Sequence, residues 1–442
     1  VGNFVSNDSY SYQNTALGLF VQDDWKLTPR LTLSLGLRYE MPGPLTERFN
    51  RSVGGFDFSA ASPIEAAART NYQARPIPEV PVENFRVLGG LTFPGVNGRS
   101  RHLTSRDRNN FAPRIGIAFS LDARTVLRGG YGVFYDQLGT SRLSFNQTGF
   151  SRTTSLVSSL DNGQTYIASI ANPFPNGFQH ADGTTAGLAT NLGQSVTFYN
   201  EELVNPYMQR WQWSVQRELF QNAVLEVAYV GNRGTKLRIS RQANPIPREY
   251  LSTSPVRDQP AIDYLSAAVP NPFYPLLPGT GLSGTNTTRG QLLRPYPHFT
   301  GVSRDIQQGY SWYHSMQTRF EKRFAAGYTV NVSWTWAKFM EAIGYLNDTD
   351  PMPERVISDQ DRPHRVVVTG VYELPFGRGR RWGSQWPGVL NGVLGGWQVA
   401  NIFQYQSGPA LGFGNAIFTG DLADIPLSSG ERSRTRWFNT AA

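Results

Sequence analysis

Hydrophobic and polar residues alternate strictly along residues 17–40 and predict two strands joined by a tight turn. This period of two is typical of a β-strand whose two faces meet different environments. The turn is predicted at Thr28-Pro29-Arg30, because the proline ring fixes its own φ. In the second strand the apolar face carries Leu31, Leu33, Leu35, Leu37 and Tyr39, and the polar face carries Thr32, Ser34, Gly36, Arg38 and Glu40.

The same alternation recurs four more times along the chain. We predict further hairpins near residues 111–135, 209–231, 311–338 and 366–406. The fifth hairpin has a longer connection, in which a short helix is predicted around residues 387–394. Glycines weaken the strand predicted near 125–135, but they suit bends and close approach between strands. The pattern therefore predicts an all-β, antiparallel up-and-down architecture with about ten strands.

The connections between predicted strands alternate in length. Turns within the first four hairpins are a few residues long, whereas the links between hairpins span roughly 41–110, 136–208, 232–310 and 339–364. Such long irregular loops argue against an ordinary compact domain. They fit a transmembrane β-barrel with short periplasmic turns and long extracellular loops.

The environment of the apolar face depends on whether the strands form a soluble sandwich or a membrane barrel. A soluble sandwich buries its apolar face against a second sheet, whereas a barrel turns that face to lipid and lines its lumen with the polar face. Alternation alone is compatible with both, and the asymmetry of loop lengths favours the barrel. We therefore expect residues 1–442 to form one partial barrel domain in an outer membrane of the Gram-negative type.

Composition narrows the alternatives further. The chain has 442 residues with 44 Gly, 29 Pro and no Cys, so disulfides, cysteine-ligated metals and thiol nucleophiles are excluded. The net charge of +8 comes from scattered residues rather than a basic stripe, so nucleic acid is not an expected partner. No run of about 18 apolar residues predicts a membrane-spanning helix. The first residue is not Met and no signal peptide opens the chain, so we expect the natural start to lie upstream.

Several segments together resemble the barrel of TonB-dependent outer-membrane receptors, in particular the Oar-like branch. They include FVQDDWKLTPRLTLSLGLRYE (20–40), TVLRGGYGVFYD (125–136), NPYMQRWQWSVQREL (205–219) and DRPHRVVVTGVYELPFGRG (361–379). The resemblance implies a 22-stranded barrel closed by an N-terminal plug, which imports a substrate with energy passed by TonB. It also implies outer-membrane lipid, the TonB complex acting through an upstream plug, and an unidentified extracellular ligand as partners. The plug, the TonB box and a terminal aromatic strand are not found here, which indicates an interior part of a barrel.

Motifs for catalysis or cofactors are weak. No zinc-protease spacing and no Gly-x-Ser-x-Gly elbow occur, so neither an enzyme nor a cofactor is predicted. Residues 231–236 (GNRGTK) are interpreted as a strand-exit turn rather than a phosphate loop. Four aspartates in one long loop suit calcium, but the EF-hand spacing is absent, so a solvated acidic loop is favoured. These aspartates are Asp348, Asp350, Asp359 and Asp361.

Aromatic residues in proline-stiffened loops are the candidate ligand contacts. Rigid aromatics bind sugars or peptides by stacking and apolar contact, and they can equally pack loops against each other. Uptake by a receptor is the favoured hypothesis. A non-transporting outer-membrane adhesion or surface-organisation protein is the alternative, and a soluble secreted β-protein is the third hypothesis. The candidate contacts are Phe273, Tyr274, Tyr296 and Phe299.

Overall fold

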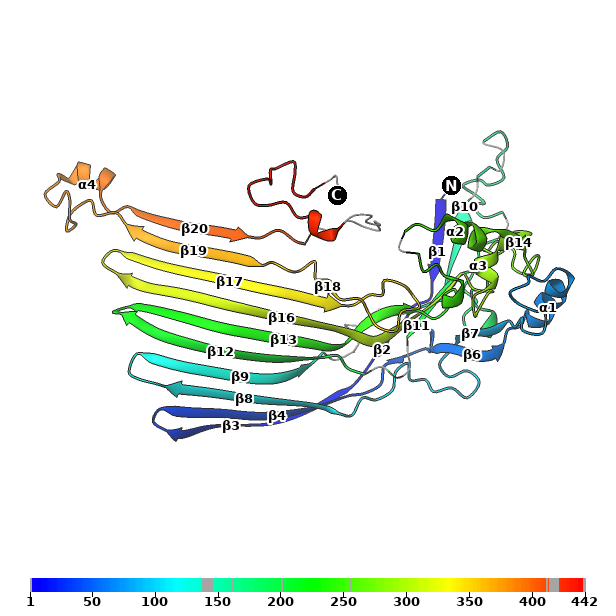
Figure 1. Cartoon of the computed structure of the whole chain (residues 1–442), viewed down its shortest axis with the longest axis horizontal. Helices are drawn as coiled ribbons and strands as arrows, with labels where there is room; N and C mark the ends of the chain where they lie inside the picture. Colours follow the sequence, from blue (N-terminus) through cyan, green and yellow to red (C-terminus); the bar gives the residue numbers. More distant parts are fainter. Residues whose placement is uncertain are drawn as a thin grey trace.

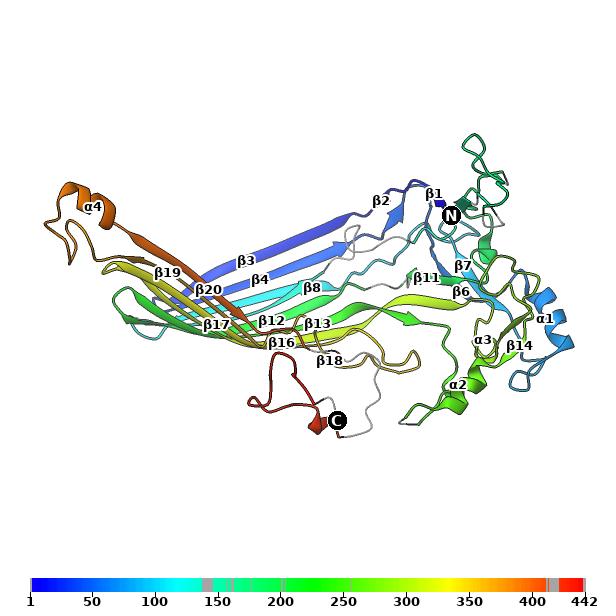
Figure 2. The same cartoon turned by 90° about the horizontal axis from the view of Figure 1, so that it is seen from above.

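Ten long strands form one curved antiparallel sheet in chain order in the computed structural model (Figures 1 and 2). Two short strands extend this sheet, β11 (Ser195–Tyr199) beside β16 and β18 (Val356–Ile357) beside β17. The outer strands β3 and β20 are its two edges. The predicted all-β, up-and-down architecture of about ten strands is therefore confirmed. The strands are β3 (Ala16–Thr28), β4 (Leu31–Pro42), β8 (Asn110–Ser120), β9 (Thr125–Tyr135), β12 (Tyr207–Phe220), β13 (Ala223–Gln242), β16 (Gly301–Ala325), β17 (Tyr328–Ala342), β19 (His364–Glu373) and β20 (Gln398–Gln406).

The structure describes most of the chain. The described residues are 2–136, 146–156, 158–159, 163–175, 177–199, 202, 204–254, 256–410, 412 and 421–439. Within these ranges, every helix is too short or too polar to cross a membrane.

Short turns gather at one end of the sheet and long connections at the other (Figure 1). Asn222, Ala326 and Gly327 adopt positive φ angles of 64°, 57° and 83° in two of these turns. Asn222 and Gly327 tolerate this conformation, which favours a turn at each of these positions, whereas Ala326 adopts it beside Gly327 in the tight β16–β17 turn. The longer β19–β20 connection at the same end carries α4 (Gly388–Leu394), where a short helix was predicted.

The strand register aligns the predicted apolar faces into one continuous surface. Leu35 pairs with Ile115, Ile115 with Tyr131, and Tyr131 with Trp211. Further along, Val332 pairs with Phe320 and Val368, and Val368 with Phe403. Much of this surface is open, since Ile115 is 52% and Trp213 60% exposed. An apolar face of this size needs a covering layer.

Two glycines on the apolar face are required by packing. A Cβ on Gly129 would lie 2.5 Å from the Trp213 ring, and one on Gly231 would lie 2.4 Å from the Trp211 ring. Each indole therefore occupies the space above a glycine of the neighbouring strand. This is the close approach that the glycines were expected to permit.

The three longest connections fold together into what we call the outer-loop layer, formed by the described parts of 43–109, 146–206 and 243–300. Most of its buried apolar side chains share one core, in which Tyr72 and Phe85 stack with ring centroids 3.9 Å apart. The expectation of irregular loops is wrong for this layer, because its short elements are stabilised by contacts between distant segments. The principal elements are β6 (Gly55–Ala61), α1 (Glu65–Ala74), β7 (Leu88–Thr92), η1 (Gly187–Ala189), η2 (Arg248–Tyr250), α2 (Gln259–Ser266), β14 (Ala268–Pro270), β15 (Asn286–Thr288) and α3 (Arg289–Leu292).

Smaller elements complete the described chain. β1 (Gly2–Asn7) pairs with β10 (Ser151–Leu156), and β2 (Tyr12–Gln13) pairs with β5 (Thr46–Glu47). A 3-10 turn, η3 (Leu422–Asp424), follows the sheet.

Residues 231–236 do not form the strand-exit turn that was expected. Strand β13 runs through them to Gln242 and stays paired with β16. Its register shifts around Lys236, whose φ of 59° marks a bulge. An extra residue in one strand bends it without ending it, and this allows β13 to continue into the outer-loop layer.

Candidate functional site

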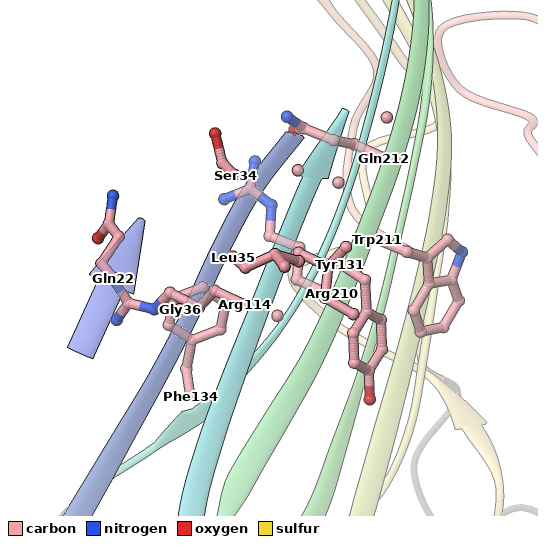
Figure 3. Close-up of a pocket in the computed structure, with 15 residues that line it drawn as sticks. Gln22, Ser34, Leu35, Gly36, Arg114, Tyr131, Phe134, Arg210, Trp211 and Gln212 are labelled. Atoms are coloured by element: carbon pink, nitrogen blue, oxygen red, sulfur yellow. The ribbon is translucent and has the colours of Figure 1, made fainter. Parts of the chain in front are cut away.

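A hollow lies on the polar face of the sheet, above strands β3, β4, β8, β9 and β12. Its volume is about 550 Å³. Figure 3 shows Ser34 and Gln212 on one side of these strands and Trp211 and Tyr131 on the other, as the alternation requires. The polar-face residues that line it are Gln22, Ser34, Gly36, Arg114, Gly116, Gly130, Gly132, Phe134, Arg210 and Gln212.

Two arginines flank one glycine across three adjacent strands of the hollow. Arg114 on β8 and Arg210 on β12 both pair with Gly132 on β9, which spaces their Cα atoms by roughly 10 Å. The Arg114 guanidinium lies 4.9 Å from the centroid of the Phe134 ring. Both side chains are exposed, and neither has an acidic partner among the described residues. Exposed guanidinium groups without an acidic neighbour bind carboxylates and phosphates through paired hydrogen bonds.

The glycines of the hollow differ from those on the apolar face. A Cβ on Gly36 or Gly130 would have its nearest neighbour 3.7 Å away, which is ordinary contact. Packing therefore does not demand glycine at these two positions. Their lack of side chains instead deepens the space between the arginines and the amides of Gln22 and Gln212.

The four aromatic residues predicted as ligand contacts all lie in the outer-loop layer, but in different environments. Phe273 and Phe299 are completely buried in its core, whereas Tyr274 is 47% exposed. Tyr296 is half-buried, and its ring centroid lies 5.4 Å from that of Phe56. The two phenylalanines thus pack the loops together and have no surface to offer an external ligand. For Tyr274 and Tyr296, ligand contact stays a prediction.

The two arginines were not singled out from the sequence. Both occupy polar positions of predicted strands, so alternation places each on the polar face. Their approach to Gly132 depends on the relative register of β8, β9 and β12. Strands β9 and β12 are separated by a 71-residue connection. No short stretch of the sequence therefore indicates how these two strands align.

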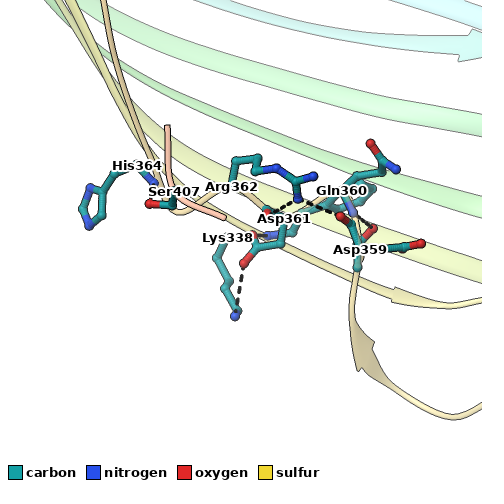
Figure 4. Close-up of polar contacts among 9 residues, drawn as sticks. Lys338, Asp359, Gln360, Asp361, Arg362, His364 and Ser407 are labelled. Carbon is teal, nitrogen blue, oxygen red and sulfur yellow. Dashed lines mark hydrogen bonds and ion pairs between the residues drawn. The ribbon is translucent and has the colours of Figure 1, made fainter. Parts of the chain in front are cut away.

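Asp361 is not solvated as expected but is 3% exposed. Its carboxylate accepts a hydrogen bond from the Phe339 N–H at 2.7 Å and lies 3.5 Å from the Lys338 ammonium (Figure 4). Arg362 donates to the backbone oxygens of Asp359 and Asp361. This aspartate therefore holds the β17–β19 connection in place. In the part of the chain that the structure describes, no three acidic or histidine side chains converge as a metal site.

His298 is a buried titratable group in the core of the outer-loop layer. It is 0% exposed and packs on Phe299 with ring centroids 4.4 Å apart. Its Nε2 lies 3.2 Å from the Gly89 carbonyl, and its Nδ1 has no partner among the described residues. Burial lowers the pKa of this imidazole to about 4, although the Gly89 carbonyl opposes the shift.

We expect the outer-loop layer to lose stability in mild acid through His298. The folded pKa lies below the ordinary value of about 6.5, so the unfolded layer takes up the proton first as the pH falls. The contribution is intact above about pH 6.5, has fallen by about 2 kcal/mol at pH 5, and is lost as the pH approaches 4. Hydrogen exchange of residues 85–93 between pH 7 and 5 measures this loss. His298→Gln should flatten the pH dependence, and an unchanged profile in that variant would assign the effect to other groups.

Comparisons with known proteins place the chain in a family. The model of the outer membrane beta barrel domain matches residues 2–442. No curated protein matches. Solved structures with a similar arrangement include the alcaligin outer-membrane receptor FauA from Bordetella pertussis, at 9% identity and a TM-score of 0.38, where the match covers 91% of this chain and 39% of that one.

Two further structures are similar at the same low level. The ferripyoverdine receptor of Pseudomonas aeruginosa is 8% identical, with a TM-score of 0.34 and coverage of 82% and 26% of the two chains. The siderophore receptor PiuA from Acinetobacter baumannii is 8% identical, with a TM-score of 0.35 and coverage of 82% and 32%. The chain thus spans less than half the length of each of these proteins. In such barrels the apolar face contacts lipid and the polar face lines the lumen. From the match over residues 2–442, the chain belongs to the outer membrane beta barrel domain family and is located in the outer membrane of a Gram-negative-type cell.

Proposed function

We propose that this chain is the barrel part of a TonB-dependent receptor that takes up an unidentified substrate through the outer membrane. The observation that carries the proposal is the lumen-facing hollow, in which Arg114 and Arg210 flank Gly132. Two exposed guanidiniums with no acidic partner among the described residues form a positively charged patch that attracts an anionic group.

The outer-loop layer supplies the extracellular side of this function. Its packed core holds Tyr274 at the surface, where a rigid ring contacts a ligand at little entropic cost. Energy for uptake comes from TonB through an upstream plug, as the resemblance of residues 20–40 and 205–219 implies. The role is binding and transport rather than catalysis.

A transport assay in the native host tests the proposal. We expect deletion of the gene for the full-length receptor to abolish growth on its substrate in a panel of scarce nutrients, and deletion of TonB to have the same effect. Complementation by the full-length gene should restore growth only when TonB is present. Surface binding that is unchanged without TonB, together with unaltered growth on every nutrient, would instead establish the adhesion or surface-organisation function.

The role of the two arginines of the hollow in transport can be tested in the same assay. Charge-assisted hydrogen bonds contribute about 1.5–3 kcal/mol each, so the double variant Arg114→Gln/Arg210→Gln should lower the uptake rate at least tenfold at equal receptor abundance. Arg124→Gln is the matched control, because Arg124 lies in the β8–β9 turn at the opposite end of the strand. Equal rates for both variants would remove the hollow from the transport path.

A further inference from the structure

Two arginines lie at the outer edge of the lipid-facing apolar surface. Arg233 on β13 pairs with Trp312 on β16, so both project from the same face. Arg355, just before β18, approaches the same ring, with its guanidinium carbon 5.6 Å from the Trp312 centroid. Its Nε also donates to the Tyr310 hydroxyl at 3.3 Å. We call Arg233 and Arg355 the outer cationic pair.

The pair lies where the apolar surface ends. On β17 the outward apolar residues run from Tyr328 to Trp336, which is about 26 Å along the strand at about 3.3 Å per residue. At a strand tilt of about 40° this covers about 20 Å of membrane, close to the apolar band of about 25 Å in outer-membrane barrels. The next outward residue, Lys338, interrupts this apolar run, and the row of Met340, Trp312 and Arg233 follows it. These guanidiniums therefore lie at the level of the lipid headgroups.

Among the described residues, no acidic side chain neutralises the charges of the pair. Lys338 nearby is matched by the buried Asp361 carboxylate at 3.5 Å (Figure 4). Arg355 contacts a neutral hydroxyl and a neutral ring, and Arg233 is exposed. Among the described residues neither arginine has an acidic partner. An anionic group at the membrane interface matches both of these charges.

We propose that Arg233 and Arg355 bind the phosphoryl headgroup of an outer-leaflet lipid. Guanidiniums match phosphate oxygens with paired hydrogen bonds, and basic residues at a membrane surface attract anionic headgroups. Trp312 between the two charges is suited to the same interface, since indoles concentrate there. The acyl chains of the lipid then lie along Met316 and Trp336, which pair on the same face two rows below Trp312, past the row of His314 and Lys338. The site is independent of any substrate in the lumen.

Lipid binding by the detergent-purified full-length protein tests this site. Binding is measured by native mass spectrometry with lipid A, with dephosphorylated lipid A and with inorganic phosphate. This comparison distinguishes recognition of the phosphoryl headgroup from recognition of the acyl chains and from binding of a free anion. We expect at least tenfold tighter binding of lipid A than of its dephosphorylated form, and much weaker binding of inorganic phosphate. Arg233→Gln/Arg355→Gln should remove this preference, and Arg233→Lys/Arg355→Lys should retain part of it.

Arg217→Gln is the matched control, because Arg217 is an exposed arginine at the inner end of the same face of β12. It should bind lipid A as the unmodified protein does. Heat-modifiable migration on gels shows that each variant is folded. Equal lipid A binding by the glutamine double variant overturns the site, and tight binding of inorganic phosphate with no lipid preference makes it a free-anion site instead.

Discussion

Val332→Lys is expected to prevent the full-length protein from assembling in the outer membrane. Val332 lies in the middle of the outward face of β17, between Phe320 on β16 and Val368 on β19. A lysine near the bilayer midplane of a barrel costs about 2–4 kcal/mol. No acidic residue occupies the paired positions, so the charge cannot be neutralised there. Leu35 is a poorer test site, because it pairs with Asp23.

Asn331→Lys is the matched control for this prediction. Asn331 is the preceding residue of the same strand, faces the lumen, and pairs with Glu321, which accommodates the new charge. Assembly is measured by heat-modifiable migration and by protease resistance of the protein in isolated outer membranes. We expect the control to assemble normally and Val332→Lys to be degraded. Normal assembly of both would mean that this face of β17 does not contact lipid.

The strands of the sheet were predictable because their signal is local. Each strand of the predicted hairpins carries its own alternation, and turn residues such as Asn222 and Gly327 mark where the chain reverses. The register between hairpins is not local. The meeting of Arg114 and Arg210 at Gly132 is therefore visible only in the folded sheet.

The outer-loop layer was not predictable, because its structure depends on contacts between residues far apart in the chain. Its helices and strands are short, and α2 has eight residues, too few to show a clear period. Its core instead joins residues far apart in the chain, such as Phe56 and Phe299, whose ring centroids are 5.8 Å apart. The sequence could identify aromatic, proline-stiffened segments, but whether each ring faced a ligand or the core depended on these long-range contacts.

Phe273→Ala is expected to unfold the outer-loop layer and leave the sheet intact. The Phe273 ring is completely buried, 6.4 Å from the centroids of both Phe85 and His298. Truncating a buried phenylalanine lowers the free energy of unfolding by about 3–5 kcal/mol. This is a large part of the stability that packing gives to so small a layer. Limited proteolysis of intact cells should then cleave within 243–300, while the heat-modifiable migration of the barrel is retained.

Tyr274→Ala separates the structural role of this segment from ligand binding. The neighbouring Tyr274 ring is exposed, so its removal should change stability by less than about 0.5 kcal/mol and leave the proteolysis pattern unchanged. If Tyr274 contacts the substrate, the same variant should weaken binding by about tenfold, in line with the loss of one aromatic contact. Phe273→Ala would lose binding too, but only together with protease resistance. If residues 243–300 of Phe273→Ala remained resistant to protease, the core around Phe85 would be stable without this ring. The stability of the layer would then be attributed to its hydrogen bonds.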